Sequence, residues 1–203
     1  MIQFQIIRSL RDGSPARLHV HFGGEATDGT AALLSGQIAI AKARLRSDLA
    51  SLPVRVPVQG QGLQALAKSN GSDGLLLRGI EFGLSPETIT WADFVCAQDW
   101  SNLKSVGGAF TVLGFGTGGS TLATVKRARV AKIEVSSRSG LLPDADGDLG
   151  VSELAILNAT LSMAQAMGIA VVAGLIETQA QLARVRELGF SEYLSAEHLH
   201  SAA

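Results

Sequence analysis

Three glycines, Gly114, Gly116 and Gly119, follow an apolar segment with the spacing G-x-G-x-x-G. In dinucleotide-binding folds such a loop brings the backbone close to a pyrophosphate, and an acidic residue about 20 positions later binds the ribose. Glu134 stands at that distance after Gly114. The loop also has a simpler explanation, because Gly116 and Gly118 could let the chain turn from a strand into a helix at backbone angles that other residues resist. Nucleotide binding is therefore one of two competing interpretations.

His19 and His21 form a second group that could do chemistry. Two positions apart on a strand, they share one face, whereas Leu18 and Val20 lie on the other. The apolar face should meet helices, so the histidines should point inward. Two imidazoles without a third located ligand give weak support for a zinc site. We therefore expect a hydrogen-bonded pair in the core and no metal.

Composition excludes several classes of protein. Charged residues make up 17% of the chain and the formal net charge is −1, so no overall field attracts a nucleic acid polymer or an anionic membrane. The single cysteine, Cys96, cannot form an internal disulfide or a thiolate cluster, and we expect it to be a small buried hydrophobe. We expect no secretory signal, and the sequence has no apolar run of about 20 residues. We expect a cytoplasmic protein with one domain over residues 1–203 and no membrane segment.

Hydrophobic periodicity predicts strands alternating with helices, which is typical of α/β folds with a parallel sheet. The strands are expected at residues 2–7, 17–22, 54–58, 74–80, 109–113, 130–135, 170–176 and, more weakly, 192–195. The helices are expected at residues 28–50, 63–68, within 87–104, and at 121–127, 151–167 and 178–188. The turn residues at 11–15 make the first two strands a hairpin. A closed barrel and an open doubly wound sheet both fit this order.

Several segments resemble EAL domains, the phosphodiesterase family for the bacterial second messenger cyclic di-GMP. Residues 113–118 resemble the family's D-D-F-G-T-G, residues 132–134 its K-I-D, and residues 171–178 its V-V-A-E-G-V-E-T. Phe4-Gln5-Ile6-Ile7 is a shorter match to F-Q-P-I. The segments occur in the family's order. A dinucleotide fingerprint would normally lie in an early βαβ unit, so the order favours the EAL interpretation.

The resemblance implies a variant (β/α)₈ TIM-type barrel with an antiparallel first strand. Because the chain is shorter than the roughly 250 residues usual for this fold, shortened or missing helices are expected. Family members hold two divalent cations with carboxylates and an asparagine, and these cations activate water. The corresponding positions carry His19, Arg55 or Pro57, Arg78, Leu113, Gly114 and Gly174. These are poor ligands for hard cations, so we expect no cation site and no catalytic residues.

Some charged residues keep the family's character, and they define a vestigial pocket in this sequence. The pocket is expected to contain His19, Arg78, Glu81, Lys132, Glu134 and Glu177. The resemblance places Lys132 and Glu177 at the same barrel mouth. The cations could recognise an anion or form salt bridges with the glutamates. We favour salt bridges, because buried charges are seldom left unpaired.

The function implied is that of a catalytically inactive regulatory or protein-interaction module in signalling related to cyclic di-GMP, without a cofactor. Its partner would be another protein, or a second copy in a homo-oligomer. A cyclic di-GMP receptor and a residual phosphodiesterase are alternatives, and a dinucleotide-binding oxidoreductase domain is a third. The stretch after the family's E-A-L has become Phe22-Gly23-Gly24, and its late glutamine falls near Ser195. We therefore expect weak or no binding of cyclic di-GMP.

Overall fold

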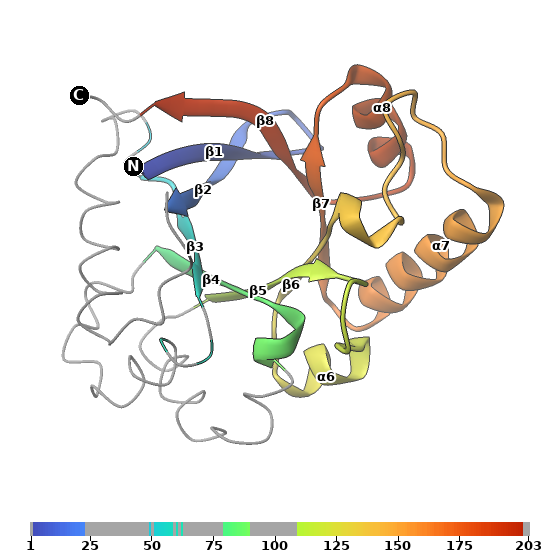
Figure 1. Cartoon of the computed structure of the whole chain (residues 1–203), viewed down its shortest axis with the longest axis horizontal. Helices are drawn as coiled ribbons and strands as arrows, with labels where there is room; N and C mark the ends of the chain where they lie inside the picture. The colour runs from blue at the N-terminus through green and yellow to red at the C-terminus, as the bar shows by residue number, and fades with distance from the viewer. Residues whose placement is uncertain are drawn as a thin grey trace.

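The computed structural model describes residues 2–22, 49, 51–58, 60, 62, 79–89 and 109–200, and the observations below concern these residues. Eight strands close into a barrel in chain order (Figure 1). They are β1 (Ile2–Ser9), β2 (Pro15–Phe22), β3 (Val54–Val58), β4 (Ile80–Leu84), β5 (Ala109–Phe115), β6 (Lys132–Val135), β7 (Ala170–Ile176) and β8 (Glu192–His200). Strand β1 pairs antiparallel with both β2 and β8, and the other neighbours are parallel. The predicted barrel with an antiparallel first strand is confirmed.

The described helices lie outside the second half of the barrel (Figure 1). They are α6 (Leu122–Arg127), the 3₁₀ turn η1 (Ser137–Ser139), α7 (Val151–Ala166) and α8 (Gln179–Glu187). Helix α8 begins with the capping box expected from its sequence, in which the Thr178 side chain accepts from the Gln181 backbone and the Gln181 side chain returns the contact. Within the described residues, no helix has the length and apolar character needed to cross a bilayer.

Most predicted strands lie close to the expected positions, and two differ. Of the strand predicted at residues 74–80, Ile80 is the first residue of β4, which continues to Leu84, and Gly79 adopts a positive φ of 75° in a turn before it; residues 74–78 lie outside the described residues. The weak last strand is longer than predicted and extends from Glu192 to His200. The helices predicted at 28–50 and 63–68, the 87–104 segment beyond Ile89, Cys96 and Arg78 lie outside the described residues.

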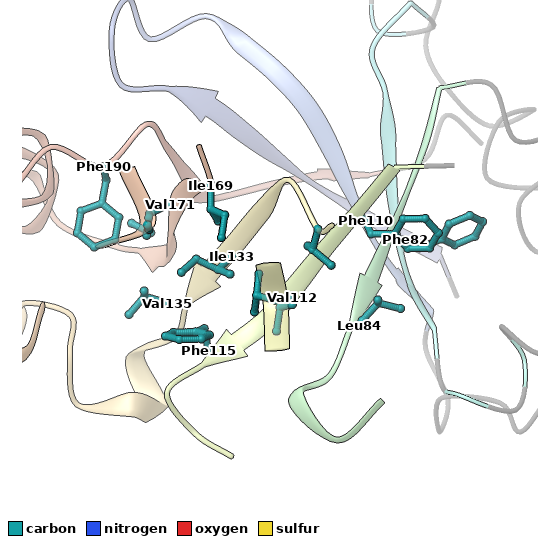
Figure 2. Close-up of a cluster of buried hydrophobic side chains, with 14 of the residues drawn as sticks. Phe82, Leu84, Phe110, Val112, Phe115, Ile133, Val135, Ile169, Val171 and Phe190 are labelled. Atoms are coloured by element: carbon teal, nitrogen blue, oxygen red, sulfur yellow. The ribbon is translucent and has the colours of Figure 1, made fainter. Parts of the chain in front are cut away.

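The two faces of the barrel wall differ in chemistry. Apolar side chains at alternate strand positions, among them Phe82, Phe110, Ile133 and Val171 in Figure 2, form one buried cluster that includes residues of α6, α7 and α8. A smaller apolar cluster of Ile7, Val172 and Leu194 is separate from this layer. Several ionisable side chains, including Arg17, Arg55 and Glu81, are nevertheless buried. Strand alternation therefore separates an apolar outer core from a polar interior.

Candidate functional site

The amino-terminal half of the barrel interior contains an ion-pair network centred on Glu81. The Glu81 carboxylate accepts from Thr111 Oγ1 at 2.7 Å, pairs with Arg17, and lies 3.7 Å from Lys132 Nζ. Glu192, at the start of β8, pairs with Arg17 at 2.6 Å and with Lys132 Nζ at 3.2 Å. The network joins β2, β4, β5, β6 and β8. Glutamates within the network therefore neutralise Arg17 and Lys132, which agrees with the salt bridges favoured in the sequence analysis.

Arg17 and Glu192 were not among the predicted site residues, although a signal existed for each. Arg17 lies two positions before His19 on β2, so strand alternation places both on the inner face. Glu192 begins the strand whose length was underestimated. The sequence did not show that these two residues pair with each other, because they are 175 positions apart.

A second layer lies nearer the carboxyl ends of the strands and is centred on Arg55. This side chain is fully buried, and its Nη2 lies 2.5 Å from the Glu134 carboxylate. Its Nε donates to His19 Nδ1 at 3.0 Å. Because the guanidinium can only donate, His19 Nδ1 must carry a lone pair. His19 also meets the ring of His21 edge-on, with centroids 4.5 Å apart. The expected hydrogen-bonded histidine is therefore confirmed, and its partner is Arg55.

Burial lowers the pKa of His19 well below its ordinary value of 6.5, with smaller contributions from Arg55 and His21. Burial raises the pKa of Glu192, against the opposing influence of Arg17 and Arg55. His19 is therefore neutral at neutral pH, which is the form that accepts the Arg55 hydrogen bond. Glu192 favours its protonated form more than an exposed glutamate does.

These shifts predict acid-sensitive stability. Since the pKa of His19 is lowered on folding, the unfolded chain binds more protons below about pH 6.5, and the free energy of unfolding should fall as the pH drops further. The raised pKa of Glu192 changes the free energy of unfolding in the opposite direction as the pH drops. Urea unfolding of the wild type and of His19→Gln between pH 7.5 and 5 measures the contribution of His19. We expect a flatter profile for the variant; parallel profiles would contradict the assignment.

The carboxyl ends of β3, β4, β5 and β6 surround a pocket of about 580 Å³. Among the described residues, its wall contains glycine, apolar and hydroxyl side chains, one arginine and one carboxylate. The described lining residues are Pro57, Val58, Gly60, Gly83, Ser85, Thr88, Leu113, Gly114, Thr117, Glu134, Ser136 and Arg138. The carboxylate, Glu134, already pairs with Arg55. Among the described side chains, no group of three histidine, cysteine or acidic residues is arranged to hold a metal.

Two positions near this mouth are packed too closely for a larger side chain. Leu113 lies over Gly83, where an added Cβ would be 2.6 Å from Leu113 Cδ1. At Gly174 an added Cβ would be 2.8 Å from the Val135 carbonyl oxygen and 3.2 Å from Ser136 Cα. Backbone atoms therefore occupy the space that a side chain at position 174 would need.

The glycine loop connects β5 to α6, and its glycines serve different purposes. Gly114 and Gly116 have positive φ values of 66° and 94°, which confirms a conformational role for Gly116. Gly118 does not have a positive φ, and instead its position lies close to Pro86 and Glu87. Gly119 has open space where its Cβ would be. The loop thus turns the chain within a closed barrel, and Glu134 pairs with Arg55 inside that barrel.

The prediction that Lys132 and Glu177 are neighbours was wrong. Lys132 begins β6 and pairs with Ala170, the first residue of β7. Glu177 follows the last residue of β7 and is exposed. Seven strand residues separate the two levels, which is roughly 23 Å at about 3.3 Å per residue. His19, Glu81, Lys132 and Glu134 lie inside the barrel in two layers, whereas Glu177 lies apart from them at the other end of β7.

A protein-family model described as the EAL domain matches residues 62–193. The chain belongs to the EAL domain family. The match spans most of the chain, including β4 to β7 and the interior residues on those strands. A comparison with curated protein sequences finds no significant match.

Solved structures share the fold of this EAL domain at low sequence identity. BlrP1 of Klebsiella pneumoniae, in a complex with calcium and cyclic di-GMP, has a TM-score of 0.76 and 15% identity over 96% of this chain, which spans 54% of the BlrP1 chain. The PaMucR phosphodiesterase in complex with c-di-GMP has a TM-score of 0.73 and 19% identity, with coverage of 96% and 93%. The EAL domain of Mycobacterium smegmatis DcpA has a TM-score of 0.76 and 17% identity, with coverage of 98% and 92%.

Strand β4 contains one of the two predicted positions of the family's E-I-T-E motif. Arg78, where the first glutamate of E-I-T-E is placed, precedes the strand and lies outside the described residues, so its place in the pattern stays a prediction. Glu81, which keeps the family's acidic character, lies on β4, and its carboxylate contacts Arg17, Thr111 and Lys132. The carboxylate is therefore part of a neutralised network.

Proposed function

We propose that this EAL domain does not hydrolyse cyclic di-GMP and acts instead as a regulatory module through contacts with another protein in cyclic di-GMP-related signalling. The observation that carries the proposal is the chemistry of the barrel mouth. Family membership supports the signalling context. The related BlrP1 and PaMucR structures are complexes with cyclic di-GMP, and the BlrP1 complex also contains calcium.

The donors at the mouth do not fit a pair of hard divalent cations. Such cations need several oxygen ligands in a defined arrangement. Glu134 is the carboxylate in the lining of the described pocket, and Arg55 neutralises it at 2.5 Å. At Leu113 and Gly114, where the family has paired aspartates, the lining offers a hydrocarbon side chain and a glycine. From the part of the chain that the structure describes, a cation at this mouth would meet the Arg55 charge and too few oxygen atoms.

The close packing at the mouth supports a loss of activity that one substitution cannot reverse. Leu113 fills the space above Gly83, and the end of β6 fills the space at Gly174. A carboxylate at position 174, where the family has one, would need room that backbone atoms now occupy. This close packing supports the proposed inactivity alongside the poor ligand set.

An exposed apolar face on α7 supports a role in protein contacts. Ile156 and Met163, seven positions apart and therefore on one face of the helix, have exposed fractions of 54% and 51%, and Val151, at the start of the helix on another side, is 87% exposed. Glu153 is the one charged residue of this sixteen-residue helix. Exposed apolar side chains on a helix with so little charge are typical of surfaces that bind other proteins.

A cyclic di-GMP receptor is the second candidate function, and Arg138 is the observation that favours it. Its guanidinium is exposed at the edge of the pocket, which also contains the hydroxyl groups of Ser85, Thr88 and Thr117. These groups could bind a phosphate without a metal. The apolar floor at Leu113 and Pro57 offers few polar contacts to the remainder of such a ligand, which supports weak binding.

Incubation of the pure protein with cyclic di-GMP and Mg²⁺ or Mn²⁺ tests the proposal. We expect no linear or mononucleotide product by chromatography, with the PaMucR phosphodiesterase as the positive control. Turnover that is abolished by Lys132→Ala would overturn the proposed inactivity. Calorimetric titration with cyclic di-GMP, with and without Mg²⁺, then separates the two candidates. Submicromolar binding that Arg138→Ala removes would make the domain a receptor.

A further inference from the structure

A second pocket, of about 390 Å³, lies beside β7, where α7 and α8 both contact that strand (Figure 1). We call it the lateral pocket. One wall is α7 from Asn158 to Gln165, the floor is Ile169 with the start of β7, and the other wall is the turn between α8 and β8. Ala170, the first residue of β7, belongs to the floor. The lateral pocket is therefore at the opposite end of this strand from the barrel mouth.

The α7 wall carries three uncharged polar side chains in a row. Asn158, Ser162 and Gln165 follow one another at steps of four and three residues, so they share one face of the helix. All three are exposed, and within the described part of the chain none of their side chains has a hydrogen-bond partner. Asn158 and Gln165 are separated by roughly 10 Å along the helix axis, at about 1.5 Å per residue. The wall therefore offers two amides and a hydroxyl group to a ligand of that length.

The floor is apolar, and its described backbone donors are already used. Ile169 and Val171 are each only 5% exposed. The Ile169 amide donates to the Ala164 carbonyl at 2.9 Å. Ser191, on the opposite wall, donates to the Val171 carbonyl from its amide at 2.9 Å and from its hydroxyl at 2.8 Å. A peptide cannot add here as a further strand, because the barrel is closed and these groups are paired. A flat ligand could instead lie on the floor.

The charges around the lateral pocket select against an anion. Its described lining contains no ionisable side chain. The pocket lies beside the second half of α7, and the carboxyl end of a helix carries a partial negative charge that disfavours anions. Lys126 reaches the end of α7, where its ammonium donates to the Met167 carbonyl at 2.6 Å, but it is not part of the described lining. The ligand should therefore be uncharged.

The amide side chains favour a flat group that presents a donor beside an acceptor. The amide of asparagine or glutamine donates through its nitrogen and accepts through its oxygen, which matches N6 and N7 of adenine. The O6 and N7 edge of guanine instead needs two donors, which arginine or lysine supplies, and the described lining has neither. A volume of about 390 Å³ is near the lower end of the range for small-molecule sites, about 300–1,000 Å³. Size and chemistry fit one nucleoside better than a dinucleotide.

We propose that the lateral pocket binds a neutral adenine nucleoside, with the base on the apolar floor and its N6 and N7 edge against Gln165. Gln165 is the amide closest in sequence to the buried floor residue Ile169. Ser162 and Asn158 would then bind the ribose hydroxyl groups. The described linings of the lateral pocket and of the barrel mouth share no residue, so the proposal does not depend on the proposed function. A bound nucleoside would join α7 to the α8–β8 turn and stabilise the folded domain.

Calorimetric titration of the full chain with adenosine, guanosine and adenosine monophosphate tests this site. We expect one adenosine to bind saturably, and each of the other two compounds to bind about fivefold more weakly or less. Saturation-transfer NMR should show contact with the adenine ring protons. Gln165→Glu keeps the shape of the side chain but removes the amide donor, so it should weaken adenosine binding about fivefold or more. Ser162→Leu should abolish binding, because the larger side chain fills the pocket.

Ser152→Leu is the matched control, because Ser152 is also an exposed serine of α7 and is not in the described lining. This variant should bind adenosine as the wild type does, and circular dichroism checks that each variant is folded. No saturable adenosine binding up to about 1 mM, the level of weak contacts, would overturn the proposal. Adenosine binding that both Gln165→Glu and Ser162→Leu leave unchanged, or that Ser152→Leu abolishes, would overturn it too. So would guanosine or adenosine monophosphate binding as tightly as adenosine.

Discussion

Replacement of Arg55 by methionine is expected to lower the free energy of unfolding by roughly 3–5 kcal/mol, because it leaves a partner charge buried without compensation. The guanidinium is fully buried, pairs with Glu134 and holds His19 through its Nε. Methionine has a similar length and no charge, so packing is largely kept while the ion pair is lost. Chemical denaturation at pH 7.5, with the midpoint and slope fitted separately, measures the effect.

Arg184→Met is the control for this experiment. Arg184 pairs with Glu187 on the surface of α8, where 34% and 67% of the two side chains are exposed. Such a pair contributes about 0–1 kcal/mol, so this variant should unfold near the wild-type midpoint. The double variant Arg55→Met with Glu134→Leu should recover much of the lost stability, because both charges are then removed. Equal small effects of Arg55→Met and Arg184→Met would show that the interior pair does not stabilise the barrel.

A Cβ at position 174 is expected to destabilise the barrel, so that Gly174→Ala lowers the free energy of unfolding by about 1–3 kcal/mol. The added atom would lie 2.8 Å from the Val135 carbonyl oxygen, and backbone cannot move aside as a flexible side chain can. Gly174→Glu, which restores the family's acidic residue, should destabilise the protein further and give no phosphodiesterase activity. Thermal and urea unfolding, with a cyclic di-GMP assay of the folded fraction, measure both effects.

Gly119→Ala provides the comparison for position 174. Gly119 lies in the β5–α6 loop, has open space where a Cβ would be, and is not among the glycines with positive φ. We expect its substitution to change stability by less than about 0.5 kcal/mol. A Gly174→Glu protein that folds as well as the wild type and hydrolyses cyclic di-GMP would disprove the repacking of the mouth.

The fold could be predicted largely from the sequence because its signals are local. Buried parallel strands are continuous apolar runs, and the β7 boundaries, residues 170–176, follow from such a run. Thr178 and Gln181 have the three-residue spacing of a capping box, and this spacing likewise marks the start of α8. No local sequence pattern showed whether the sheet closes into a barrel. The order of motifs and the antiparallel first hairpin indicated a barrel, whereas periodicity alone also fitted an open sheet.

The candidate site was predicted less well, since its interactions join distant parts of the chain. His19, Glu81, Lys132 and Glu134 were identified by residue type, but Arg17 and Glu192 depend on partners on other strands. The error about Lys132 and Glu177 has a related cause. Motif order shows which strands are neighbours, but it does not show the level at which a side chain enters the barrel. Lys132 is level with Ala170, and Glu177 lies beyond the opposite end of β7.

The ion pair between Arg17 and Glu192 has a consequence for the time at which the chain can fold during synthesis. Until β8 has emerged, β1 lacks one of its two strand partners and Arg17 lacks one of its two carboxylates. A nascent chain that ends before residue 192 therefore contains an open sheet edge and an incompletely neutralised interior. Contacts between residues this distant are costly to form early. Closure of the barrel should consequently be a late, concerted step that follows release of the last strand.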